Sequence, residues 1–93
     1  MKIKIKVTYD EDLYFGDGDC VPQKKDCLIG LFDDLKDAEK AAENLIKKSE
    51  KDYHFVRYYE HPYEEDDIMK TYKTEEINNE YYCIDIYFNL VLS

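Results

Sequence analysis

The sequence predicts an α+β fold, in which a mainly antiparallel β-sheet carries one helix on one face and the elements follow the order β-β-α-β-β-β. Two observations support this prediction. Residues 80–93 alternate at a period of two and are rich in aromatic and β-branched side chains, which is typical of a strand on a core. Residues 35–50 hold the chain's clear helical repeat. One helix segregated on one face of a sheet defines the class.

Length and composition limit the organisation of the chain. With 93 residues, of which 44% are hydrophobic and 15% aromatic, the chain can bury one modest core, so we expect a single α+β domain over residues 1–93. The first ten residues lack the apolar region of a signal peptide, and no run approaches membrane-spanning length. Three Cys without framework spacing fit a reducing compartment. These features predict a cytoplasmic protein.

The first third of the chain is expected to hold two strands separated by a long loop. Residues 2–9 alternate Lys and Thr with Ile, Val and Tyr, which predicts a half-buried strand with a lysine face toward solvent. Residues 10–26 are rich in Asp, Gly and Lys and contain Pro22, which predicts a long acidic loop. Residues 27–32 form a short apolar run, which we interpret as a buried strand leading into the helix.

The helix is expected to begin at Asp33 or Asp34, because an Asp side chain can accept from the first free N–H groups. Asp37 adds negative charge where the helix dipole favours it. Apolar residues then recur at helical spacing through about residue 50: Leu35, Ala38, Ala42, Leu45 and Ile46. This narrow, alanine-rich stripe is expected where a helix lies close on a sheet.

The segment between the helix and the last strand contains two further elements. Residues 53–60 have strand composition, His61 and Pro62 are expected to break the strand, and residues 63–67 are expected to form an acidic loop. Residues 68–77 fit either a short helix after Pro62 or a strand. We favour a strand that pairs with residues 80–93 through a tight turn at Asn78-Asn79, because Asn tolerates positive φ.

The last strand has two different faces. One face carries an unbroken apolar row that must lie on the core: Tyr82, Ile84, Ile86, Phe88, Leu90 and Leu92. The other face is more polar and includes Tyr81, Asp85 and Tyr87. If this second face is buried, Asp85 needs a partner such as Arg57 or a Tyr hydroxyl. We favour an exposed recognition surface, because one helix covers only one face of a small sheet.

No motif for catalysis, a cofactor or a metal is recognisable. Cys20 and Cys27 are too far apart for a zinc ligand pair, and no Cys can be placed beside His54 or His61 from the sequence. The acidic stretch fails the calcium-loop pattern, since Phe15 takes the sixth place counted from Asp10. We therefore expect no enzyme, no cofactor and no metal site. A small protein that uses Cys or His for metal binding or catalysis is kept as an alternative.

Negative charge gathers in segments that also contain aromatic residues. The net charge of −9 disfavours direct binding to nucleic acid or to an anionic membrane and favours a basic protein partner. Charge runs are most often solvated surface, and that interpretation stays open. Carboxylates mixed with Tyr also suit docking on an Arg- and Lys-rich surface. The expected partner-binding residues are Asp10, Glu11, Asp12, Tyr14, Phe15, Asp17, Asp19, Tyr63, Glu64, Glu65, Asp66, Asp67, Tyr81, Asp85 and Tyr87.

Two resemblances add to this interpretation. The run IGLFDDLKDAEKAAENL resembles the strand-to-helix unit of many small bacterial and phage domains. In size, acidity and Tyr content, the chain resembles small phage-encoded anti-defence proteins such as anti-CRISPRs. That resemblance implies a non-enzymatic, stoichiometric inhibitor that mimics nucleic acid on a nucleic-acid-handling effector in the host cytoplasm. The remaining alternative is a self-associating structural module that forms a homodimer through a sheet edge.

Overall fold

The five strands form one antiparallel sheet in the order β2-β1-β5-β4-β3, with β5 at its centre. The computed structural model describes residues 2–16, 18–63 and 67–92, and the side chain of Tyr63 is outside this description. The elements are β1 (Ile3–Phe15), β2 (Cys20–Phe32), α1 (Leu35–Ser49), β3 (Phe55–Tyr63), β4 (Asp67–Thr74) and β5 (Glu80–Leu92). The predicted α+β class and the order β-β-α-β-β-β are confirmed.

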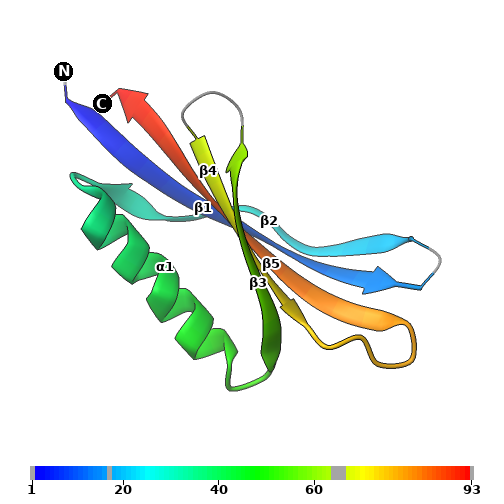
Figure 1. The fold of residues 1–93 in the computed structure, drawn as a ribbon. Coiled ribbons are helices and arrows are strands. Elements are labelled where there is room, and N and C mark those ends of the chain that lie inside the picture. Colours follow the sequence, from blue (N-terminus) through cyan, green and yellow to red (C-terminus); the bar gives the residue numbers. More distant parts are fainter. Residues whose placement is uncertain (1, 17, 64–66, 93) are drawn as a thin grey trace.

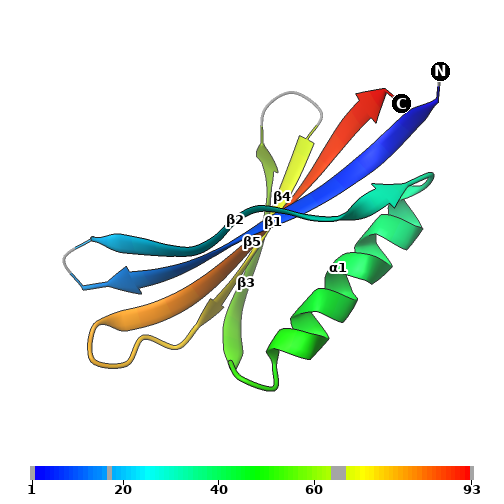
Figure 2. The ribbon, with the colours of Figure 1, turned by 180° about the vertical axis from the view of Figure 1, so that it is seen from behind.

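The sheet is long and strongly twisted, and α1 lies beside one half of it. The strands fan out from β1 to β3, and the helix runs along one side (Figure 1). From behind, the end of the β1–β2 hairpin and the start of β5 extend away from the helix, while the two termini lie together at the opposite end (Figure 2). The molecule measures 49 × 25 × 20 Å. Within the described residues, α1 therefore covers part of one face of the sheet, and no helix lies on the opposite face.

The core lies between α1 and one face of the three middle strands. Alternate residues of β5 reach it: Tyr82, Ile84, Ile86 and Phe88. From the helix, Ala38, Ala42 and Ile46 pack against them at intervals of one turn, and the two alanines allow close approach. The expected core row is confirmed as far as Phe88. Leu90 and Leu92 were expected in this row but are 53% and 65% exposed, because the helix does not extend over that end of the sheet.

The helix begins as its sequence predicts. The Asp34 carboxylate accepts from the backbone N–H of Asp37 at 2.8 Å, which makes Asp34 the N-cap. Asp33 instead pairs with Lys4 of β1. Leu35 was expected on the apolar stripe but is exposed, because it precedes the first turn that contacts the sheet.

The long acidic loop predicted for residues 10–26 is wrong. β1 continues to Phe15 and β2 begins at Cys20, so most of this stretch is a hairpin. Two of the acidic side chains can lie in the sheet because lysines of β2 neutralise their charge. The Lys24 ammonium lies 3.8 Å from the Glu11 carboxylate, and the Lys25 ammonium lies 3.6 Å from the Asp10 carboxylate. The buried strand predicted for residues 27–32 is the second half of β2. Since β2 is an edge strand, its Leu28 and Leu31 are exposed.

The second half of the chain follows the strand interpretation. Residues 67–74 form β4, and Asn78 and Asn79 turn the chain with φ of 54° and 65°, so the predicted hairpin is confirmed. The break predicted at His61 and Pro62 is wrong. β3 runs through Pro62 to Tyr63, which is permitted because β3 is an edge strand and Pro62 needs no partner for a missing N–H.

Candidate functional site

The face of the sheet opposite α1, here called the helix-free face, collects most of the polar residues of the middle strands. Asp10, Asp12 and Tyr14 of β1 lie directly opposite Asp85, Cys83 and Tyr81 of β5. β4 places Thr71 opposite Asp85, and β3 places Tyr59 opposite Thr71. Because side chains alternate along a strand, all of these residues point away from the core row. The predicted polar face of β5 therefore does lie opposite the core.

A cleft of about 600 Å³ lies on this face, within the size range of ligand pockets. We call it the tyrosine cleft. Its lining comes from four strands: Tyr14 from β1; Tyr59, Glu60 and His61 from β3; Met69, Thr71 and Lys73 from β4; and Tyr81, Cys83 and Asp85 from β5.

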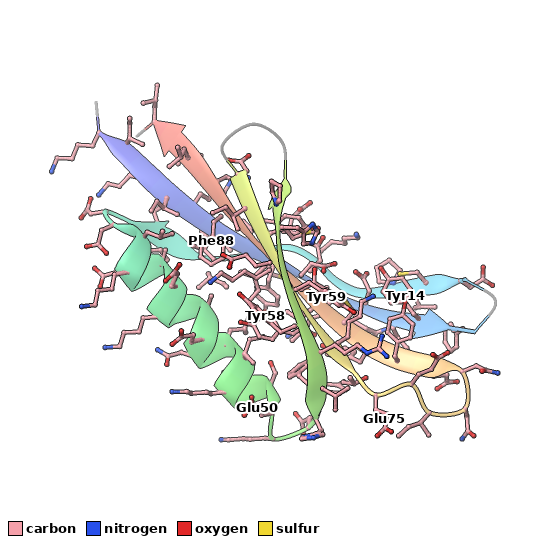
Figure 3. All side chains as sticks on the ribbon, in the orientation of Figure 1. Tyr14, Glu50, Tyr58, Tyr59, Glu75 and Phe88 are labelled. Atoms are coloured by element: carbon pink, nitrogen blue, oxygen red, sulfur yellow. The ribbon has the colours of Figure 1, made fainter. Side chains whose placement is uncertain are left out.

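Aromatic rings form two sides of the tyrosine cleft. The rings of Tyr14 and Tyr81 are stacked, with centroids 4.9 Å apart and planes 5° from parallel. On the β3 side, Tyr59 faces Tyr14, whereas its neighbour Tyr58 lies on the helix side of the strand (Figure 3). The Lys73 Nζ lies 5.5 Å from the Tyr59 ring centroid and 5.3 Å from that of Tyr81. One ammonium group is thus held near the rings of both sides, at cation–π distance.

The floor of the tyrosine cleft contains the carboxylate of Asp85, whose orientation is fixed by hydrogen bonding. The Thr71 hydroxyl donates to Asp85 Oδ1 at 2.7 Å, and His61 Nε2 lies 3.4 Å from the same hydroxyl. Since the Thr71 proton is directed at Asp85, the chain His61–Thr71–Asp85 orients the carboxylate. The partners expected for a buried Asp85, Arg57 or a Tyr hydroxyl, were wrong. Asp85 is half-buried, and its Oδ1 accepts from Thr71 of β4 and, at 3.6 Å, from the Cys83 thiol.

Cys83, the cysteine that lines the cleft, has an unreactive thiol. Burial and the neighbouring Asp85 carboxylate raise the pKa of Cys83 to about 12, so its thiol is protonated at neutral pH and is a poor nucleophile. Partial desolvation and the nearby Asp12 carboxylate also raise the pKa of Cys20, which is exposed at the hairpin end. Among residues 2–16, 18–63 and 67–92, no group of three or more His, Cys, Asp or Glu side chains is arranged to hold a metal ion.

Three consecutive acids that the sequence placed in a docking loop are buried in β1. Asp10 accepts from the backbone N–H of Asp26 at 2.8 Å, and Glu11 faces the helix side. Burial, together with a hydrogen bond to Glu11, raises the pKa of the Tyr82 hydroxyl. Asp12 is only 3% exposed, and its Oδ1 has no hydrogen-bond partner in the described part of the chain. Asp10, Glu11 and Asp12 are therefore buried in the sheet and not exposed in a loop, and their role in docking stays a prediction.

Burial does not remove the electrostatic influence of Asp12 on the cleft. Its charge, acting with burial, contributes to the raised pKa of Tyr14 and of Cys83, both of which line the cleft. Asp12 thus adds negative potential from behind the cleft wall, close to the carboxylate of Asp85.

The other predicted contact residues are dispersed. Tyr87 is half-buried on the helix-free face, whereas Phe15 belongs to the helix side and Asp19 is exposed at the turn of the β1–β2 hairpin. Tyr63 and Asp67 pair at the ends of β3 and β4, and the Asp67 carboxylate accepts from the Leu90 N–H at 3.4 Å. The predictions for Asp17, Glu64, Glu65 and Asp66 lie outside the described residues. Of the predicted residues that the structure describes, Tyr14, Tyr81 and Asp85 line the cleft.

Sequence reasoning missed the contribution of β3 and β4 to the site. Tyr59, His61, Thr71 and Lys73 join it only through the pairing of these strands. Alternation within residues 53–63 could have placed Tyr59 and His61 on one face, but no sequence signal said which face.

Comparison with family models, with curated proteins and with solved structures found no match to this chain. In the part of the chain that the structure describes, no helix combines the length and apolar character needed to span a membrane.

Proposed function

We propose that this protein is a non-enzymatic binding protein that inhibits a basic, nucleic-acid-handling partner stoichiometrically by docking its helix-free face. The observation that carries the proposal is the tyrosine cleft. It combines three exposed or half-buried Tyr rings with an oriented carboxylate, Asp85, on a rigid floor of paired strands. Aromatic anchors beside charged groups are the usual composition of strong contact sites.

Charge supports a basic partner. The chain carries a net charge of −9, so its field attracts basic proteins and repels nucleic acid. On a nucleic-acid-binding protein, the Asp85 carboxylate of this face would take the position of a phosphate. Such an inhibitor and the nucleic acid would compete for one surface, and binding would weaken as salt is raised.

The chemistry of the cleft favours binding over catalysis. The Thr71 hydroxyl is directed at Asp85, and the Cys83 thiol stays protonated because its pKa is raised to about 12. The Asp85 carboxylate lies where it can accept the Thr71 proton, but Thr71 is only 6% exposed, so its hydroxyl is poorly accessible to a substrate.

The test begins with capture of partners from the native host cell on wild-type protein and on a Tyr59→Ala, Asp85→Lys double variant. A partner retained only by the wild type is then purified and titrated in a series of salt concentrations, with and without its nucleic acid. We expect one-to-one binding that nucleic acid displaces. Retention of the same proteins by both baits, or a partner that binds nucleic acid and this protein together, would contradict the proposal.

Self-association is a second candidate function, and one observation favours it. Ile3 and Leu92 are paired across β1 and β5, lie beyond the helix and are 64% and 65% exposed. A second copy could cover this apolar end. Pairing through the sheet edges is less suitable, because Pro22 in β2 and Pro62 in β3 have no N–H to donate and β2 bulges at Asp26, whose φ is positive. Sedimentation of wild type and Leu92→Glu would decide it: a dimer that the substitution dissociates supports this function, and a monomer excludes it.

A further inference from the structure

We infer that the tyrosine cleft is a receptor site for a single arginine side chain of the partner, with the guanidinium held by the rings of Tyr59 and Tyr81 and paired with the Asp85 carboxylate. This inference rests on the proposed function and names the chemical group that the site recognises. Three features of the cleft support it: its existing cation, its excess of negative charge, and the shape of its walls.

The cleft already holds a cation supplied by the chain itself. Lys73 places its Nζ within 5.5 Å of both the Tyr59 and the Tyr81 ring centroids. Within the described residues, no carboxylate lies within ion-pair distance of this ammonium, so the rings provide its contacts. The ring faces are therefore arranged as a cation site, and Lys73 occupies it on a flexible stem that can leave.

Negative charge exceeds positive charge around the cleft. Asp85 lies on its floor, and the buried Asp12 carboxylate beside Cys83 has one oxygen without a hydrogen-bond partner among the described residues, whereas the Glu60 side chain points to the helix side and pairs with Lys70. Among the described residues that line the cleft, Lys73 is the only Lys or Arg. A second positive group is thus electrostatically favoured in the cleft.

The geometry favours guanidinium over ammonium. The stacked pair of Tyr14 and Tyr81 presents flat ring surface, on which a planar guanidinium can stack. Asp85 is held by Thr71 at 2.7 Å through one oxygen, which leaves its other oxygen for a charge-assisted bond. An ammonium group can use the rings but gains less from this combination of stacking and paired hydrogen bonding.

The test is a nuclear magnetic resonance titration of the full chain with two blocked peptides, acetyl-Gly-Arg-Gly-amide and acetyl-Gly-Lys-Gly-amide. We expect the arginine peptide to bind more tightly and to shift the resonances of Tyr14, Tyr59 and Tyr81. Asp85→Asn keeps the acceptor for Thr71 and should weaken arginine binding about tenfold, since it removes a charge-assisted bond. Glu43→Gln, on the exposed side of α1, is the matched control and should change binding little.

A second variant separates this site from general electrostatic attraction. Lys73→Gln removes the internal competitor and should strengthen arginine binding roughly three- to tenfold, as expected for a cation released from two rings. Lys47→Gln removes the same charge from the helix surface and serves as its control. Equal effects of the two lysine variants, equal affinity for the two peptides, or shifts confined to other residues would overturn the inference.

The inference and the proposed function can fail separately. If the arginine peptide does not bind the cleft but the captured basic partner still competes with nucleic acid, the arginine site is wrong and the proposed function stands. If the arginine peptide binds as expected but captured partners do not compete with nucleic acid, the site is supported and the proposed function is wrong.

Discussion

Asp10→Ala tests whether the acidic stretch of β1 is structural. Asp10 accepts from the Asp26 N–H at 2.8 Å, where β2 bulges with a φ of 49°, and Lys25 lies 3.6 Å from its carboxylate. Removing the acceptor leaves this N–H without its charged partner, which costs about 1.5–3 kcal/mol. The pair with the exposed Lys25 adds little, because solvent screens it. Loss of repulsion from Asp85, directly opposite, returns about 0.2–1 kcal/mol.

The net expectation for Asp10→Ala is a loss of about 1–3 kcal/mol in the free energy of unfolding, or roughly 5–20 °C in Tm for a domain of this size. Asp10→Asn keeps an oxygen acceptor and loses the repulsion, so it should stay within about 1 kcal/mol of wild type. Chemical denaturation measures both, and hydrogen exchange reports on the Asp26 amide. A wild-type Tm for Asp10→Ala with unchanged protection at Asp26 would refute the structural role.

Three further predictions concern the helix cap, the hairpin and the thiol. Asp34→Ala should destabilise by about 0.5–2 kcal/mol in chemical denaturation because it removes the N-cap. Asp33→Ala removes an exposed ion pair with Lys4 and should cost less; the reverse order would contradict the assignment. Asn79→Val should cost about 1–2 kcal/mol because its φ is 65°, while Asn79→Gly should not destabilise the hairpin. The pKa of the Cys83 thiol is about 12 in the folded protein, above its value in the unfolded chain. The stability linked to the neutral thiol is therefore fully present below the unfolded pKa and is lost as the pH rises toward 12. Cys83→Ala should flatten that alkaline loss, and an identical pH profile would contradict it.

The fold class could be predicted because local signals agreed with the tertiary structure. Asp34 caps the helix, Asn78 and Asn79 form the hairpin turn, and the alternation of residues 80–93 places Ile84 and Ile86 on the core. Each of these follows from a local pattern with a direct physical cause. Such signals depend on neighbouring residues and not on distant ones.

The acidic stretch was misinterpreted because its compensation comes from another strand. Asp10 is satisfied by Lys25 and by the Asp26 N–H, a pairing that depends on the bulge in β2. Composition alone indicated a solvated loop, since buried carboxylates are rare without partners. The partner residues are present in the sequence, but no local pattern predicts that they contact Asp10.

The cleft could be predicted only in part because it depends on strand register. Continuing the ladder from the Ile77–Glu80 bridge would place Thr71 opposite Ile86, but the irregular stretch before the turn shifts Thr71 opposite Asp85. A slip of one residue moves a side chain to the other face of a sheet. The register therefore decides whether Thr71 and Lys73 line the site or the core.

The central claim is that a partner docks on the helix-free face, and adjacent tyrosines of β3 test it most directly. Tyr58 and Tyr59 are 49% and 43% exposed and lie on opposite faces of the sheet (Figure 3). Oxidative footprinting with mass spectrometry, with and without the captured partner, measures the protection of each ring. Protection of Tyr59 with Tyr58 unchanged is the predicted result; protection of Tyr58 with Tyr59 unchanged would contradict the claim.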